Sequence, residues 1–305
     1  MKKVISVIAF ILILGVFLSG CQKSNDGIVA KVGNINISQE EFDEDYQVYK
    51  GLYEKQLGED VLSQVGVDGK TFGETLKENI LNKLIMETLI SEDSETMGIT
   101  ITDEDLKEYV DEYKVSMGGE DGYLEFLESN NLSENFFINS MRKELLLNSH
   151  KENIIAGFNV DENEAEEYFQ SNKDSLIEVR ASHILLGSEE DAIMILERLD
   201  GGEKFDDLAK TESLDSVSGV KGGDLGYFPR GQMISEFEEI AFSLELGEIS
   251  EVVKTEVGYH IIQLVDKLDT FDELEEKVFV VIKEDKYFNY IEELKSKADI
   301  EKYLD

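Results

Sequence analysis

Apolar residues in the first half of the chain recur at helical spacing. Between Glu74 and Met97 they fall every four or five residues, as in a helix with one buried face, and include Leu76, Ile80, Leu84 and Leu89. Gly98 predicts the end of this helix. Further helices are predicted to start at Ser38, Thr102, Ser133 and Asp161, with the glutamate of a capping box three residues after Ser38 and Asp161. Residues 38–173 are therefore predicted to be almost entirely helical.

Shorter stretches alternate between apolar and polar residues, which is the period of a strand. Residues 28–37, IVAKVGNINI, predict a hairpin with Gly33-Asn34 at its turn. Residues 177–185, IEVRASHIL, predict a strand, and residues 251–268, EVVKTEVGYHIIQLVDKL, predict a closing strand pair. Between them lie a glycine-rich loop at 219–231 and three helical patterns, SEEDAIMILERL, KFDDLAKTES and SEFEEIAFSL.

These patterns predict an α+β protein in which a helical domain is interrupted by a smaller module with a mainly antiparallel sheet. The helical segment covers residues 21–175, the module covers 176–268, and residues 269–305 form a helical segment that packs back on the helical domain. Two consecutive domains with a loose tail are the alternative. The helical spacing after residue 270 favours an ordered tail, through Phe271, Leu274, Val278, Val281 and Ile282.

The N-terminus has the pattern of an export signal. Lys2 and Lys3 precede an uncharged run, Val4 to Leu18, which is shorter than the roughly 20 residues of a spanning helix. The run ends in LSGC, which resembles a bacterial lipobox with Cys21 as the lipidated residue. An ordinary signal peptide with a stray cysteine is the alternative. Because Cys21 is the only cysteine, no disulfide can form within the chain, and lipidation accounts for an otherwise unexplained thiol. Residues 1–20 are predicted to be a lipoprotein signal peptide.

Charge narrows the range of partners. Loss of Lys2 and Lys3 with the signal peptide leaves 27 of the 29 basic residues against 67 acidic ones, formally −40. Such a chain repels nucleic acid and anionic lipid surfaces, so nucleic-acid binding is not expected and membrane attachment must come from the lipid. One acyl chain holds a protein only weakly, whereas a diacylated cysteine holds firmly. His150, which lies among polar residues, is predicted to be on the surface.

Two of the three histidines, His183 and His260, lie in strand-like apolar segments, and the only proline lies in the glycine-rich loop between them. The motifs ASHIL, GGDLGYFPRGQM, FEEIAF and GYHII, in this order over about 90 residues, resemble the parvulin family of peptidyl-prolyl cis/trans isomerases. The resemblance implies that His183 and His260 are paired in the site and that Asp215 belongs with them as a third catalytic residue. It also implies that Gly222, Gly223 and Gly226 turn the loop beneath the site.

The resemblance further implies a pocket for the proline ring made of Leu225, Met233 and Phe237. Isomerisation must overcome a barrier of about 20 kcal/mol that arises from amide resonance, and it needs neither metal nor cofactor. The alternatives are that the histidines mainly hold the scaffold and that Met233 and Phe237 are plain core. The flanking motifs favour the pocket. Residues 187–191, GSEED, stand where phosphate-reading parvulins carry a basic cluster, so phosphate specificity is not expected.

Together with the lipobox, the start VAKVGNINISQEEF and the returning C-terminal helix, the chain resembles the PrsA-type extracytoplasmic foldase lipoproteins. The resemblance implies an isomerase and chaperone, anchored by lipid at Cys21 to the outer face of the cell membrane. It implies unfolded secreted polypeptides with X-Pro bonds as partners and a Gram-positive envelope, and a homodimer is a further hypothesis.

Two other functions remain open. A holdase would bind apolar segments through the helical part and keep the module as a weak or inactive platform. Val257, which stands where bacterial members often have phenylalanine or tyrosine, slightly favours this alternative, whereas the intact Asp215, His183 and His260 favour activity. A transporter's substrate-binding lipoprotein would need two lobes of alternating strands and helices, and residues 38–173 show no such alternation.

Overall fold

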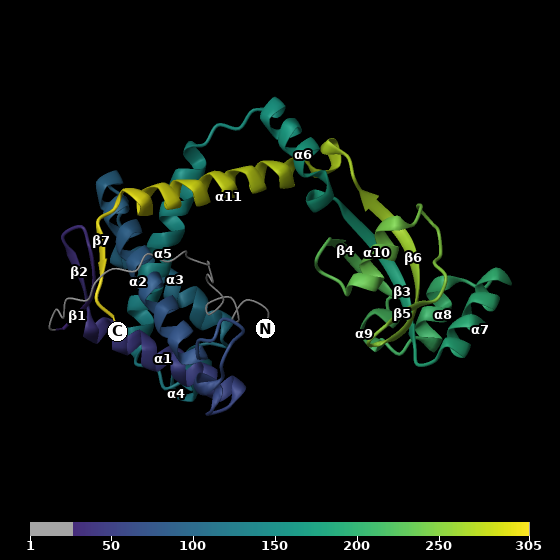
Figure 1. Ribbon diagram of the computed structural model, residues 1–305, viewed down its shortest axis with the longest axis horizontal. Helices are drawn as coiled ribbons and strands as arrows, with labels where there is room; N and C mark the ends of the chain where they lie inside the picture. Colours follow the sequence, from purple (N-terminus) through teal and green to yellow (C-terminus); the bar gives the residue numbers. More distant parts are fainter. Residues whose placement is uncertain (1–26, 305) are drawn as a thin grey trace. The chain divides into compact units, whose positions relative to one another are not determined.

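The computed structural model describes residues 27–304, so the predicted signal peptide and Cys21 lie outside the described residues. The chain forms two compact units. The first unit comprises residues 27–158 and 286–304, and the second comprises residues 159–285 (Figure 1). The predicted boundaries at residues 176 and 268 remain predictions. Within residues 27–304, no helix has the length and apolar character needed to cross a membrane.

A small antiparallel sheet in the first unit joins the two ends of the described residues. β1 (Ile28–Val32) and β2 (Ile35–Ser38) form the predicted hairpin, with Val32 opposite Ile35 across the turn. β7 (Ile300–Lys302) pairs with the other edge of β1, which gives the order β2-β1-β7 (Figure 1). The sequence predicted only a helical segment here. The difference arises because three residues are too few to show an alternating pattern.

Helices make up the rest of the first unit, and their starts follow from local capping. They are α1 (Gln39–Leu57), α2 (Phe72–Met97), α3 (Asp103–Ser116), α4 (Glu120–Ser129) and α5 (Glu134–Gly157), with a short 3₁₀ turn, η2 (Val61–Ser63). The side chains of Ser38, Thr102 and Ser133 each accept a backbone N–H in the first turn of the helix that follows, as predicted. Thr71 caps α2 in a full capping box, and Gly98 ends that helix in the left-handed region.

Two apolar clusters hold the first unit. One lies between the sheet, α1 and α2 and contains Val32, Phe42 and Leu84. The other lies between α3, α4 and α5 and contains Val110, Tyr123 and Met141. The burial of these side chains supplies most of the stability of such helices, since isolated helices are marginal in water.

The prediction for His150 was wrong, because its side chain is 0% exposed. It lies on α5, where Asp93 of α2 approaches its Nε2 to 2.8 Å and the hydroxyl of Tyr287 approaches its Nδ1 to 3.1 Å. Tyr290 donates to the same Asp93 carboxylate at 2.6 Å. Both tyrosines belong to the C-terminal helix α11 (Phe271–Lys297), so this buried cluster ties α11 to α2 and α5.

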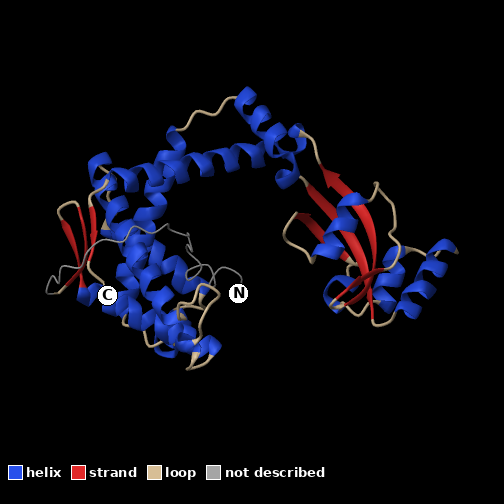
Figure 2. Ribbon diagram, in the orientation of Figure 1, coloured by secondary structure: helices blue, strands red, loops and turns tan. Residues whose placement is uncertain are grey.

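The second unit is built on a four-stranded antiparallel sheet of order β4-β3-β6-β5 (Figure 2). Its strands are β3 (Glu178–Leu186), β4 (Asp224–Pro229), β5 (Val253–Thr255) and β6 (Gly258–Leu268). Its helices are α6 (Glu162–Leu176), α7 (Glu189–Asp200), α8 (Phe205–Glu212), α9 (Ser216–Gly219), α10 (Ser235–Ser243) and the first half of α11. The predicted start of α6 is confirmed, since the Asp161 side chain accepts the N–H of Glu164. The prediction of an α+β fold is also confirmed.

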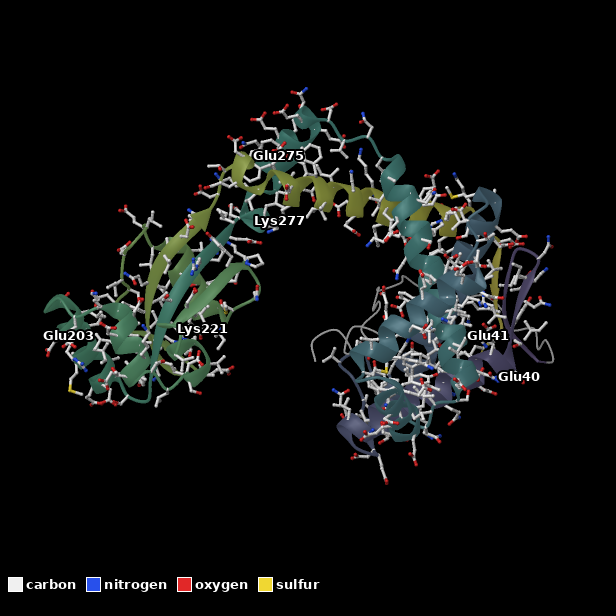
Figure 3. The ribbon with its side chains drawn as sticks, turned by 180° about the vertical axis from the view of Figure 1, so that it is seen from behind. Glu40, Glu41, Glu203, Lys221, Glu275 and Lys277 are labelled. Carbon is white, nitrogen blue, oxygen red and sulfur yellow. The ribbon has the colours of Figure 1, made fainter. Side chains whose placement is uncertain are left out.

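Each face of this sheet carries its own core because neighbouring residues of a strand point to opposite faces. On one face, Val179, Ile262 and Leu264 pack against α10; on the other, Ile184 and Ile261 pack against α7 and α8. α6 lies along the start of α11 through Phe169 and Val278 (Figure 1). Lys277, labelled in Figure 3, adds an ion pair with Glu178 at 2.7 Å where the sheet begins.

Candidate active site

The two histidines of the second unit meet at the centre of its sheet. His183 lies on β3 and His260 on β6, and these adjacent strands pair with Leu185 opposite His260. The two rings stack with centroids 5.4 Å apart and planes 20° apart, and their Nδ1 atoms are 3.1 Å from each other. Both side chains are buried. The pairing of these two adjacent strands therefore fixes the position of the histidine pair.

Hydrogen bonds extend this pair at both ends. On one side, His183 Nε2 lies 2.9 Å from Asp215 Oδ2, and Ser218 Oγ donates to the same carboxylate oxygen at 2.5 Å. On the other side, His260 Nε2 lies 2.9 Å from Thr255 Oγ1. The result is one continuous chain of hydrogen bonds, Asp215–His183–His260–Thr255, which we call the polar chain.

Asp215 is held in place by its position at the start of α9. Its Oδ1 accepts the backbone N–H groups of Val217 and Ser218. Although burial raises it, the hydrogen bonds from Ser218, His183 and the backbone hold the pKa of the Asp215 carboxyl well below its usual range. The carboxylate is therefore ionised at neutral pH and acts as the acceptor for His183.

His260 is uncharged at neutral pH. Burial, together with the neighbouring His183, lowers the pKa of His260 to about 4. One arrangement of protons then satisfies every contact without a charged ring. Thr255 donates to His260 Nε2, His260 Nδ1–H donates to His183 Nδ1, and His183 Nε2–H donates to Asp215.

The glycine-rich loop passes directly against the first histidine strand. His183 N–H donates to the carbonyl of Gly223 at 2.9 Å. A Cβ at residue 223 would lie 2.3 Å from the His183 carbonyl oxygen, and the backbone φ of +83° there also favours glycine. The loop therefore approaches β3 as closely as the backbones allow. This contact brings Leu225, which follows in β4, to the side of the sheet that carries the histidines.

An apolar cluster adjoins the polar chain on that face. Phe237 of α10 meets both rings edge-on, with its centroid 5.7 Å from that of His183 and 5.5 Å from that of His260. Leu225 and Met233 are half-buried and pack against the same cluster. The structure thus brings together all six predicted site residues, His183, Asp215, His260, Leu225, Met233 and Phe237. Their roles in binding and catalysis stay predictions.

Sequence reasoning missed two members of the polar chain. Ser218 stands three residues after Asp215, which is the spacing of a helix-start contact, so the motif DSVS carried a usable signal. Thr255 lies in the short strand β5, and the hairpin with β6 brings it back to His260. The predicted strand pair at 251–268 implied this approach, but it did not show which side chain of β5 would reach the ring.

Two family models match this chain, over separate ranges. The family described as the PPIC-type PPIASE domain matches residues 168–268, and the SurA-like N-terminal domain matches residues 1–151. The foldase protein PrsA of Caldanaerobacter subterraneus is 32% identical over 269 residues, which are 86% of this chain and 82% of that protein. The foldase protein PrsA of Halalkalibacterium halodurans is 38% identical over 208 residues, 66% of this chain and 61% of that protein.

Among solved structures, the parvulin of Nitrosopumilus maritimus is 48% identical and covers 29% of this chain and 96% of its own, with a TM-score of 0.28. A PrsA crystal structure from Bacillus anthracis is 32% identical and covers 70% of this chain and 93% of its own, with a TM-score of 0.37.

Proposed function

Because the chain belongs to the PrsA foldase family and carries a PPIC-type isomerase domain, we propose that the polar chain and the apolar cluster beside it form its active site. The protein is a peptidyl-prolyl cis/trans isomerase and chaperone, and its substrates are unfolded proteins. In the proposed site, His183, Asp215 and His260 are the catalytic residues, and Leu225, Met233 and Phe237 bind the proline ring. The observation that carries this proposal is the edge-on contact of Phe237 with both histidines.

The chemistry required of such a site is electrostatic and conformational. Amide resonance holds the X-Pro bond planar with a barrier of about 20 kcal/mol, and the uncatalysed change takes roughly 10–100 s. A catalyst must bind the twisted amide more tightly than either planar form. The apolar cluster takes up the proline ring and excludes water, so that the bond can rotate against a fixed ring.

The polar chain supplies a preorganised environment for the twisting amide. Its members cannot reorient separately, because each ring nitrogen is fixed by a neighbour. Fixed dipoles beside a dry cluster act more strongly than water would and need no reorganisation as the bond turns. Asp215 sets the orientation from one end, so its loss should disturb both rings.

The test is a proline-limited refolding assay with the soluble chain 22–305. Wild type is expected to accelerate the slow phase, and Asp215→Ala is expected to reduce kcat/KM by about 10- to 100-fold. Asp200→Ala serves as the matched control, because Asp200 is an exposed acid at the end of α7, and it should leave the rate unchanged. Equal rates for Asp215→Ala and wild type would contradict a role of the polar chain in isomerisation.

A holdase role of the first unit is the second candidate. Tyr49, Leu52 and Tyr53 of α1 line a hollow at the surface of this unit beside Asn130. Apolar side chains in a surface hollow suit extended apolar segments of an unfolded chain. If wild type suppresses aggregation of an unfolded protein and leaves its slow phase unaccelerated, the isomerase site is a binding platform only.

The family places the protein outside the cytoplasm. We further propose that lipid on Cys21 anchors it to the outer face of the cell membrane and that its substrates are secreted polypeptides with X-Pro bonds. The motif LSGC and the single cysteine support the anchor. A homodimer through the first unit is a separate hypothesis, which sedimentation of the soluble chain tests.

A further inference from the structure

A bidentate ion pair joins β3 to the start of β4, one residue away from the glycine-rich loop's contact with His183. Arg180 Nε donates to Asp224 Oδ1 at 3.1 Å, and Arg180 Nη2 donates to Asp224 Oδ2 at 2.7 Å. The side chain of Arg180 is 40% exposed and that of Asp224 is 27% exposed. Exposed ion pairs add little to stability, but the bidentate form fixes the direction of both side chains. The informative feature of this pair is therefore the segment of chain that it holds.

The carboxylate of Asp224 also binds the backbone of the loop. Its Oδ1 accepts the N–H of Gly226 at 3.0 Å, two residues further along the chain. The hydrogen bond from Arg180 lowers the pKa of Asp224, and the bond from Gly226 adds to this effect, although burial raises the pKa. The ionised carboxylate thus binds Arg180 and the loop at the same time. Leu225 lies between the two residues that are fixed in this way.

The other neighbour of Asp224 is Gly223, whose carbonyl accepts the N–H of His183 at 2.9 Å. Asp224 itself lies opposite Ser182, the residue before His183, in the pairing of β3 with β4. A bond that limits the movement of Asp224 limits the movement of both its neighbours. Arg180 therefore holds the Gly223 carbonyl against the first histidine strand and holds Leu225 against the apolar cluster.

Other contacts keep β4 in the sheet without the side chain of Arg180. Phe228 is buried in the core of this face, and its backbone pairs with Val179. The hydroxyl of Tyr227 donates to Asp266 of β6, which ties β4 to a second strand. Loss of the Arg180 guanidinium should therefore release the loop and leave the sheet intact.

We propose that Arg180 is a positioning residue for isomerisation, which acts through Asp224 by holding the Gly223 carbonyl against His183 and Leu225 beside the proline ring. Arg180 does not contact the substrate in this proposal. The inference rests on the proposed function and adds a residue to its site.

The test removes the pair in two ways in the chain 22–305. Arg180→Gln removes the guanidinium, and Asp224→Asn removes the charge but keeps an oxygen for the N–H of Gly226. The readouts are kcat/KM for proline peptides and hydrogen exchange of the His183 amide, followed by NMR. Each variant should lower kcat/KM about fivefold or more and speed this exchange about tenfold, because a shift of about 1 Å in the loop affects both.

An internal reference separates this local effect from a loss of fold. The amide of Ile262 on β6 donates to Ser250 Oγ at 2.9 Å, away from the loop, and its exchange should stay at the wild-type rate. The double variant Arg180→Gln with Asp224→Asn should lose no more activity than the weaker of the two single variants, because the two residues act as one unit.

Arg198 offers a matched control in the same unit. It lies on α7, its side chain is 39% exposed, and its Nε and Nη2 each donate to Glu203 at 2.9 Å. Arg198→Gln therefore removes an equally exposed bidentate pair that does not bind the loop. It should keep the wild-type kcat/KM and the wild-type exchange rate at His183.

Four results would overturn the inference. They are wild-type kcat/KM in Arg180→Gln, lower kcat/KM with unchanged exchange at His183, equally faster exchange at His183 and Ile262, and additive losses in the double variant. The third would show that the pair serves the stability of the whole unit. An active wild type with unaffected variants overturns the inference alone, whereas a wild type that accelerates no peptide overturns the proposed function as well.

Discussion

At the scale of single residues, the polar chain depends on a histidine that stays neutral well below neutral pH. Burial and the neighbouring ring lower the pKa of His260 to about 4. In an unfolded chain the same imidazole titrates near pH 6.5. Between these two values the unfolded state binds a proton that the folded state does not bind. The contribution of neutral His260 to the free energy of unfolding of the second unit is therefore fully present above about pH 6.5. This contribution is lost as the pH is lowered toward 4.

We predict an NMR titration midpoint near pH 4 for the ring of His260. The measurement follows the imidazole nitrogens of the three histidines in labelled chain 22–305, with His260→Gln used to assign the signal. A midpoint between pH 6 and 7 would contradict the burial of this ring beside His183, and with it the neutral form on which the arrangement of protons depends.

Met233 offers a cleaner test of the apolar cluster than Phe237. Phe237 is buried, and its truncation would cost about 3–5 kcal/mol of stability, whereas Met233 is only half-buried. Met233→Ala is expected to lower kcat/KM for proline peptides by about tenfold, because the ring loses apolar contact. Met194→Ala on α7 changes the same residue type at an exposed position and should have no effect. Wild-type activity in folded Met233→Ala would refute the pocket.

Single residues also show where sequence reasoning ends. The order of the motifs was sufficient to predict that His183, Asp215 and His260 lie together, because each lies in a short segment with a recognisable pattern. The prediction that His150 lies on the surface was wrong because its neighbours in sequence are polar. Its partners in the fold, Asp93 and Tyr287, stand 57 and 137 positions away in the chain. Helical spacing on α5 shows one buried face, and only the packed structure shows that α11 covers the residue from another side.

At the scale of elements, the contact between the glycine-rich loop and β3 decides whether the site forms. The carbonyl of Gly223 accepts the N–H of His183 in the strand, and no Cβ fits between the two backbones. The pattern of glycines indicated a turn, but the close approach to His183 is a tertiary contact that the sequence could not show.

Gly223→Ala is expected to destabilise the second unit by about 2–4 kcal/mol and to abolish most isomerase activity, since the loop must move away from His183. Gly226→Ala is the matched control. It has a similar φ of +72° but no atom within 4 Å of its Cβ position, so only about 1 kcal/mol of backbone strain is expected. Urea unfolding and the refolding assay check both variants. Equal losses would show that the close contact is unimportant.

Helices and strands differed in how well their limits followed from sequence. The starts of α3, α5 and α6 could be predicted because a cap acts within four residues of chain. β7 could not, since its three residues become a strand only through pairing with β1. The order β4-β3-β6-β5 likewise depends on pairings between distant segments.

At the scale of the whole molecule, the two units differ in whether one continuous stretch of sequence forms them. The second unit is one uninterrupted stretch, whereas the first needs residues 286–304 to complete its sheet and core. Asp299 accepts the N–H of Gly33, and Ile300 and Leu304 pack against the core of α1, α2 and the sheet.

Deletion of residues 299–305 is predicted to lower the free energy of unfolding of the first unit by about 2–4 kcal/mol, because a strand and its apolar contacts are lost. Isomerase activity should stay unchanged. Glu301→Gln, an exposed change within the same strand, is the control and should be neutral. Hydrogen exchange resolves the two units separately, and unaltered protection of β1 in the deletion variant would contradict the prediction.

Attachment to the membrane is also a property of the whole chain. Cys21→Ala is expected to release the protein from membranes or to leave its precursor unprocessed, since the high negative charge of the chain repels anionic lipid surfaces. Fractionation of cells that express the variant measures this, with Cys21→Ser as a second variant that lacks the thiol. Membrane retention at the wild-type level with normal processing would argue against the lipid anchor.

The pairing of β7 with β1 also sets an order of events during export. If the chain leaves the membrane N-terminus first, β1 emerges about 270 residues before the strand that completes its sheet. The isomerase unit, which lies between them, can be finished while the first unit still has an open strand edge. The foldase would thus complete its catalytic part before β7 closes the sheet of its own N-terminal domain.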